Sequence, residues 1–410
     1  MIQAQSPQGA SLKSASLKPA RLMPLLKHVA IASLLVFALG GCNTIKGWFG
    51  GNKNKQAEPA ELTDFTPSAS VTRLWSVQAG KGEQRLGVRQ RPAVADGRVY
   101  AAAVEGGVRA FDLQTGKPVW HYDSELPLSG GPGAGDGLVV IGTLEGDVIA
   151  LDAATGAEKW KAKVGNEVIT APAIGNGLVF VHANDGRLSA YDAATGERRW
   201  FWSKELPVLT VRGNATPTIG PGYVFVGNDD GTVTALSMTD GSELWSQAIG
   251  QAEGRTELER MADVDGPPVL DGSTLYATSY KKQTLAIDAP SGRPMWTKDN
   301  GGVGGLGLGS DRLVVSDSDG TVWALDRSTG AAMWQQAVLA RRNLSAPAVQ
   351  GDYAVVGDFD GYLHWLKLSD GTLAARERIG GKAVLAQPVV VDGILIAQNT
   401  DGELTAFQVK

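Results

Sequence analysis

A unit of about 40 residues repeats along this chain, and each copy carries its marker residues at nearly constant spacing. The markers are a proline, an Ala-x-Asp-like triplet, a Thr-Gly or Asp-Gly pair and a tryptophan. The proline and the tryptophan are 28 residues apart in five copies, which begin at Pro92, Pro132, Pro172, Pro217 and Pro268. Three other copies each lack a marker: one runs from Pro347 to Ala375, one ends at Trp334 without the proline, and one begins at Pro388 and meets the C-terminus before any tryptophan. This period predicts a propeller or a solenoid.

Each copy is predicted to form four antiparallel strands. In the third copy we expect strands at 173–174, 178–181 and 188–191, and a fourth that ends at Trp200. The segments between them are turn sequences, because glycine supplies a positive φ and Asp or Thr side chains bond backbone amides. The alanine of the triplet leaves room for the indole to pack over it, although Trp365 stands in its place in one copy. Tryptophan is therefore expected to hold the core together.

The two ends of the chain complete each other. The last copy stops after three strands, at 406–408, while the first copy is preceded by an extra strand with a tryptophan, at 73–77. Pairing these strands would close the ring and remove two free sheet edges. The sequence thus predicts an all-β, eight-bladed β-propeller of four-stranded antiparallel blades over residues 71–410, and 53 glycines suit such a turn-rich chain. An open solenoid is the alternative, but it would need polar caps.

The N-terminus resembles a bacterial lipoprotein signal. Lys27 and His28 precede an apolar run at 29–39, which is too short for a membrane helix and suits a signal peptide. Leu-Gly-Gly-Cys follows and resembles a lipobox, in which Cys42, the one cysteine of the chain, would be acylated. Residues 1–41 are then the signal peptide, with Met23 as an alternative start, and 42–70 form a lipidated flexible tether. A plain secretory signal is the alternative; Asn43, where the inner-membrane retention signal has aspartate, implies an outer-membrane address.

Net charge restricts the partners. Residues 1–41 contain four basic residues and no acidic residue, so the processed chain has 34 basic and 43 acidic residues and a net charge of −9. Nucleic acid is therefore not expected to bind.

No catalytic, cofactor or metal site is expected. The repeats resemble those of pyrroloquinoline quinone dehydrogenases, which makes an enzyme the rival class, but the vicinal disulfide typical of those enzymes is impossible with one cysteine. The Asp317-Ser318-Asp319-Gly320 segment lacks the downstream glutamate of an EF-hand loop. The four histidines are scattered, which does not suit a zinc site.

Loop length indicates a binding face instead. The strand directions place the connections between copies and the turns between second and third strands at one end of the ring, and insertions gather on the functional face of repeat proteins. Two of the long connections, 201–216 and 246–267, are neighbours. Arg212 and Asp263 each lie five residues before a copy's proline, so they are expected side by side in one patch of apolar and charged residues. The alternative is that Arg212 only pairs with Asp263 or Asp265 to hold the loops.

These features together resemble the BamB family of outer-membrane assembly lipoproteins. The resemblance rests on the lipobox, the eight units, and the segments 209–213, 263–265 and 361–365, and it covers about residues 29–410. It implies a non-enzymatic subunit of the β-barrel assembly machine, held on the periplasmic face of the outer membrane by its lipid anchor and docked on the insertase BamA. Unfolded outer-membrane proteins are a further partner class that the sequence leaves open, and a scaffold of another envelope complex is the alternative function. The family's docking patch maps onto Leu209, Val211, Arg212, Asp263 and Asp265.

Overall fold

The computed structural model describes residues 58–82, 88–211, 213–302 and 304–410. The chain divides into two units, and the second, Pro59–Lys410, contains all of the described strands. The described residues contain no helix with the length and apolarity that a membrane crossing requires. Cys42, the signal peptide and most of the expected tether lie outside the described residues.

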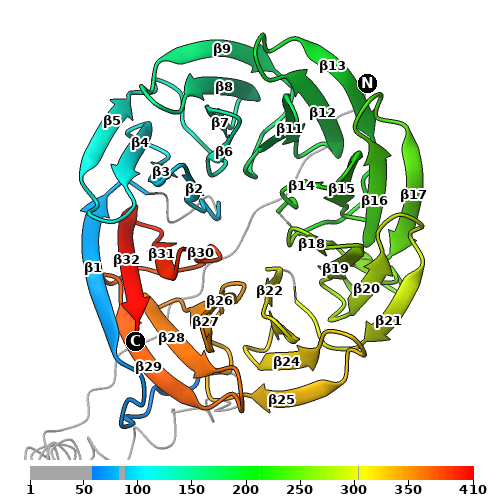
Figure 1. Ribbon diagram of the computed structural model, residues 1–410. Coiled ribbons are helices and arrows are strands. Elements are labelled where there is room, and N and C mark those ends of the chain that lie inside the picture. Colours follow the sequence, from blue (N-terminus) through cyan, green and yellow to red (C-terminus); the bar gives the residue numbers. More distant parts are fainter. Residues whose placement is uncertain (1–57, 83–87, 212, 303) are drawn as a thin grey trace, which may run out of the picture. The chain divides into compact units, whose positions relative to one another are not determined.

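Eight four-stranded antiparallel sheets form the second unit, and Figure 1 shows them arranged as a ring. The first four blades, in chain order, are β2 (Ala93–Ala95), β3 (Arg98–Ala102), β4 (Val108–Asp112), β5 (Pro118–Tyr122); β6 (Gly133–Gly135), β7 (Leu138–Gly142), β8 (Asp147–Asp152), β9 (Glu158–Lys163); β10 (Ala173–Gly175), β11 (Leu178–His182), β12 (Arg187–Asp192), β13 (Arg198–Ser203); β14 (Thr218–Ile219), β15 (Tyr223–Gly227), β16 (Thr232–Ser237), β17 (Glu243–Ala248). The last four are β18 (Val269–Asp271), β19 (Thr274–Thr278), β20 (Thr284–Asp288), β21 (Pro294–Lys298); β22 (Leu306–Leu308), β23 (Arg312–Ser316), β24 (Val322–Asp326), β25 (Ala332–Gln336); β26 (Ala348–Gln350), β27 (Tyr353–Gly357), β28 (Tyr362–Lys367), β29 (Leu373–Arg378); β30 (Val389–Val391), β31 (Ile394–Gln398), β32 (Glu403–Val409), β1 (Val71–Gln78). One short helix, α2 (Glu257–Arg260), lies between β17 and β18.

The prediction of an eight-bladed propeller is confirmed, including its closure. β1 pairs with β32 from Val71 opposite Val409 to Gln78 opposite Glu403, and Trp75 lies opposite Ala406. The predicted strands of the third blade are also found, but the fourth strand does not end at Trp200. β13 continues to Ser203 because Arg187, Leu188 and Ser189 of β12 offer further ladder partners beyond the tryptophan.

The tryptophans join each blade to the next one as well as packing within their own blade. Trp120 lies opposite Ala110 in its own sheet, while its indole N–H donates to the Ala153 carbonyl of the next blade at 3.0 Å. The ring also covers the turn glycine of that blade, since a Cβ at Gly156 would lie 2.6 Å from Cε3 of Trp120. Only glycine fits there, both for this contact and for its φ of +76°. The same donation recurs for the other marker tryptophans, at 2.7–2.9 Å: Trp75, Trp160, Trp200, Trp245, Trp296 and Trp334.

In the seventh blade the tryptophan and the alanine exchange strands. Trp365 on β28 lies opposite Ala375 on β29, so the large residue is on the third strand and the small one on the fourth. The Trp365 indole is fully buried, donates to Gln350 Oε1 at 2.8 Å, and meets Phe407 of the eighth blade edge-on at 5.7 Å. The eighth blade has no turn between its third and fourth strands, because these are β32, the last strand of the sequence, and β1, the first. A tryptophan on β29 would therefore find no turn glycine to cover.

The residues before β1 belong to the propeller unit. The Ala60 amide donates to the Ala340 carbonyl and the Ser68 amide to the Ala374 carbonyl, both at 2.9 Å. Arg342, buried and paired with Asp358 at 2.8 Å, also donates to the Ala60 carbonyl at 3.0 Å. The expectation of a flexible tether up to residue 70 is therefore wrong for residues 59–70, which backbone hydrogen bonds at Ala60, Ser68 and Ala69 attach to the propeller. The composition of this segment does not reveal these contacts.

Candidate functional site

The two long neighbouring connections lie at one end of the ring together with the turns between second and third strands. After β13, the Lys204 amide donates to the Gly186 carbonyl of the β11–β12 turn at 3.1 Å. After β17, the Ile249 amide donates to the Gly231 carbonyl of the β15–β16 turn at 2.8 Å. These contacts confirm the strand directions expected from the sequence. We call this end of the third, fourth and fifth blades the loop face.

The first connection, between β13 and β14, presents apolar side chains to solvent. Val208 is 87 % exposed, and Leu206 and Leu209 are 39 % and 42 % exposed. Neighbouring exposed apolar residues on a folded domain are typical of a binding surface. Leu258 of the second connection adds another, at 64 % exposure, on helix α2, whose start is fixed by a capping box between Thr256 and Glu259.

The two connections lie side by side, as predicted from their equivalent positions. The Val211 amide donates to Asp263 Oδ1 at 2.7 Å, and Asp263 is fully buried. Asp265 lies against the first connection, because a Cβ at Gly213 would be 2.7 Å from its Oδ2. Arg212 lies outside the described residues, so the predicted pairing of Arg212 with Asp263 or Asp265 stays a prediction. In the described structure a backbone amide ties the loops through Asp263.

A third carboxylate joins this pair, and the sequence reasoning missed it. Asp229, in the β15–β16 turn, has an oxygen within 4.8 Å of oxygens of Asp263 and Asp265. The signal in the sequence was the turn Asn-Asp-Asp-Gly, which has two aspartates. Such a trio is a ligand set of the kind that hard cations accept. Among the described residues it is the one group of acidic, His or Cys side chains close enough to share a cation.

Burial leaves the trio poorly compensated. Burial, then the charges of Asp263 and Asp230, raises the pKa of Asp229 to about 7. Burial, then the charges of Asp263 and Asp229, raises the pKa of Asp265 well above its ordinary value, against an attraction from Arg89. Oδ2 of Asp263 and Oδ1 of Asp265 are buried and have no hydrogen-bond partner among the described residues. The ionised form of these carboxyls is therefore disfavoured, and a cationic group placed beside them would favour it.

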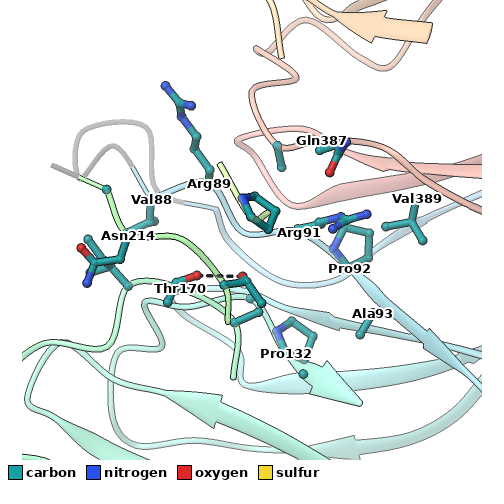
Figure 2. Close-up of a pocket in the computed structure, with 18 of the residues that line it drawn as sticks. Val88, Arg89, Arg91, Pro92, Ala93, Pro132, Thr170, Asn214, Gln387 and Val389 are labelled. Carbon is teal, nitrogen blue, oxygen red and sulfur yellow. Dashed lines mark hydrogen bonds between the residues drawn. The ribbon is translucent and has the colours of Figure 1, made fainter. Parts of the chain in front are cut away.

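A central pocket of about 340 Å³ opens beside the trio (Figure 2). Asp265, Gly213 and Asn214 from the loop face line it, together with Arg89 and Arg91 of the segment between β1 and β2. The sequence reasoning missed this pocket too, because its arginines, Arg89 and Arg91, lie outside the repeated pattern.

Known proteins resemble this chain in family, sequence and structure. The family described as outer membrane protein assembly factor BamB matches residues 62–125, 104–336 and 330–410. The BamB protein of Xanthomonas campestris pv. campestris is 63 % identical over 94 % of this chain and 98 % of its own, and that of Pseudomonas aeruginosa is 42 % identical over 94 % and 99 %. The crystal structure of BamB from Moraxella catarrhalis has a TM-score of 0.76 at 31 % identity, covering 83 % of this chain and all of that one.

The rival enzyme class shares the fold at lower identity. The quinohemoprotein alcohol dehydrogenase of Comamonas testosteroni has a TM-score of 0.64 at 16 % identity, covering 82 % of this chain and 76 % of that one. At that identity the likeness shows the fold alone.

Proposed function

This chain belongs to the BamB family of outer membrane protein assembly factors, and from that membership we propose that it is a non-catalytic subunit of the β-barrel assembly complex that docks on the periplasmic domains of the insertase BamA through its loop face. Its relatives are named as assembly factors rather than as enzymes. The docking partner comes from the family resemblance of Leu209, Val211, Arg212, Asp263 and Asp265.

One observation supports the docking site above the others: exposed apolar residues lie next to carboxyl groups whose pKa values are raised by burial. Val208 and Leu209 offer apolar surface, and Asp263 and Asp265 lie one loop away. Apolar contact area beside a group that a partner's charge can pair with provides both a buried interface core and electrostatic complementarity. A partner that presents an apolar strand or helix face with a nearby Arg or Lys would bury the side chains of Val208 and Leu209. Its basic group would pair with the carboxyls of Asp263 and Asp265.

Within this site the residues have different roles. Leu209 is exposed and would contact the partner directly, whereas Asp263 is fully buried and holds the Val211 backbone. We assign Asp263 to positioning the apolar loop. Asp265 lies at the edge of the pocket, closely packed against Gly213.

The membrane address is proposed from the signal sequence. Acylation of Cys42 would anchor the chain to the outer membrane on its periplasmic side, and more than one acyl chain is needed for stable anchoring. The Cys42→Ala variant should then appear in the soluble periplasmic fraction of cells that lack the partner complex. Retention of that variant in the outer-membrane fraction would contradict the lipid anchor.

Binding of purified chain to the purified periplasmic domains of BamA tests the docking site. We expect Leu209→Ala, and separately Asp265→Ala, to weaken binding by about 2–5 kcal/mol if their contacts are desolvated in the complex. Titration calorimetry gives the affinity, and a melting curve of each variant shows whether the fold is intact.

Two variants serve as matched controls. Met295→Ala on β21 removes an apolar side chain that is 58 % exposed, and Glu197→Ala lies in the β12–β13 turn at the opposite end of the ring. Both should bind as the parent chain does. Equal affinity of the loop-face and control variants would reject this face as the docking site, and lowered melting of the loop-face variants would show that these residues serve the fold.

A further inference from the structure

Residues 59–70, which precede β1, lie against the propeller as a strap, and Figure 1 shows them in blue near β29. Two arginine side chains of the propeller reach this strap. Arg342 Nη1 donates to the Ala60 carbonyl at 3.0 Å, and Arg376 Nη1 donates to the Thr63 carbonyl at 3.2 Å. The Arg376 guanidinium also lies 5.1 Å from the centre of the Phe65 ring, which is a cation–π contact. The attachment of the strap therefore depends on where these two guanidinium groups are held.

Both arginines are held by one fully buried pair, Asp358 and His364. Asp358 Oδ2 accepts from Arg342 Nε at 2.8 Å and from His364 Nε2 at 2.9 Å. On the other side of the imidazole, Arg376 Nε donates to His364 Nδ1 at 3.3 Å. A carboxylate only accepts and a guanidinium only donates, so these partners require the neutral tautomer of His364 with its proton on Nε2. The lone pair on Nδ1 is then the acceptor that holds Arg376.

His364 and its partners are surrounded by charged and titratable groups from five parts of the chain. These are Asp358 and Asp360 of the β27–β28 turn, Tyr362 of β28, Arg342 of the β25–β26 connection, Arg376 of β29 and Asp64 of the strap. Burial lowers the pKa of His364, and the hydrogen bond and charge of Asp358 offset this only in part, while the two arginines lower it further. The imidazole is therefore neutral at pH 7 and becomes charged in acid.

We propose that His364 is a pH-sensitive switch for the strap: a proton on its Nδ1 removes the acceptor of Arg376 and releases residues 59–70 from the seventh blade. A protonated imidazole has two N–H donors and no lone pair, so it would face the Arg376 guanidinium as a second cation at 3.3 Å. Arg376 then moves away, and the Thr63 carbonyl and the Phe65 ring lose their partner.

The direction of the pH dependence follows from proton binding. The attached form disfavours the proton on His364, so it binds fewer protons than the released form. Attachment is therefore complete above the ordinary pKa of histidine, about 6.5, and is lost as pH falls below it.

Release would lengthen the connection between the propeller and the segment that contains Cys42. The strap has twelve residues, which span about 40 Å when extended. A longer reach from the membrane rests on the lipid anchor proposed above, whereas the release itself does not depend on it.

Hydrogen exchange of the processed chain tests the release. Exchange of the strap, whose amides at Ala60, Ser68 and Ala69 are hydrogen-bonded, is followed by mass spectrometry and corrected for the intrinsic rate at each pH. Protection of the strap should be constant from pH 7 to 8 and fall by up to about tenfold per pH unit towards pH 5. The amides of β27 and β28 should keep their protection over this range.

Two histidine variants show whether the dependence comes from this site. His364→Gln has a neutral amide that can donate to Asp358, and the protection of its strap should not change between pH 5 and pH 8. His121→Gln, at an exposed position on β5, is the matched control and should follow the parent.

Strap protection that does not change with pH in the parent would overturn the proposal, and so would a pH dependence that persists in His364→Gln. Loss of protection in β27 and β28 over the same range would also overturn it, because acid would then open the blade and not the strap. If His364→Gln does not fold, Arg376→Met, at a partly exposed position, provides the second test. Its strap should be less protected than the parent's at pH 8 and should no longer respond to pH, and release that still requires acid in this variant would contradict the switch.

Discussion

At the scale of a single residue, Asp229 shows how the loop face lowers the free energy of unfolding. Its carboxyl is buried beside two others, and its pKa is raised to about 7. In the unfolded chain the same group ionises near pH 4. Between about pH 4 and pH 7 the unfolded chain has therefore released a proton that the native chain keeps, so the free energy of unfolding falls as pH rises through this window and levels off above it.

The Asp229→Asn variant removes this loss because the amide stays neutral at every pH. We expect it to be more stable than the parent by about 1–3 kcal/mol at pH 8 and nearly equal to it at pH 4. Urea unfolding at pH 4, 6 and 8 measures the difference. Asp352→Asn, at an exposed position on another blade, is the control and should follow the parent at all three values. A gap between Asp229→Asn and the parent that does not change with pH would contradict the assignment.

At the scale of the element, each blade depends on one large and one small residue at paired positions of its third and fourth strands. Trp365 and Ala375 reverse that order in the seventh blade. We expect Trp365→Ala to lower the free energy of unfolding by about 3–5 kcal/mol, because a fully buried indole leaves a cavity. Denaturant unfolding of the single variant measures this cost.

The double variant Trp365→Ala, Ala375→Trp keeps the total side-chain volume of the pair and changes only which strand carries the indole. It restores the usual order, with alanine on the third strand and tryptophan on the fourth. The indole would then face the eighth blade, which has no turn between its third and fourth strands and so no turn glycine for the indole to cover. It should remain as unstable as the single variant. Recovery of the parent's stability would show that the order of the pair has no structural reason.

These elements also show which contacts a sequence can predict. The constant distance from proline to tryptophan was sufficient to predict the blades, and the pairing of the first strand with the last followed from the incomplete copies at the two ends of the repeat series. The contact between each indole and the next blade's turn glycine could not be derived, because it joins two units whose relative placement is not encoded in either one. Residues 59–70 and the pocket arginines were missed for a similar reason: they lie outside the repeat, and only tertiary contacts define their environment.

At the scale of the whole molecule, one strand closes the ring. Trp75 is 8 % exposed and donates to the Leu113 carbonyl of the first blade at 2.9 Å, so it joins the two ends of the blade series. Trp75→Ala should lower the free energy of unfolding by about 3–5 kcal/mol, seen as a lower denaturant midpoint. Phe201→Ala, which truncates an aromatic ring that is 52 % exposed, should leave the midpoint close to that of the parent. An unchanged midpoint for Trp75→Ala would mean that β1 does not hold the ring closed.

The pairing of β1 with β32 also imposes an order of events on the growing chain. β1 is synthesised first among the strands and its partner β32 is synthesised last. The pairing of Val71 with Val409 therefore cannot form until synthesis has reached the last strand. Bringing such distant segments together costs about 5 kcal/mol of chain entropy, and contacts of this range form slowly. A chain that ends early, even by one strand, keeps β1 as an unpaired edge next to an incomplete blade, which is a template for aggregation and a target for proteases. The closing strand thus makes a stable ring conditional on a complete chain.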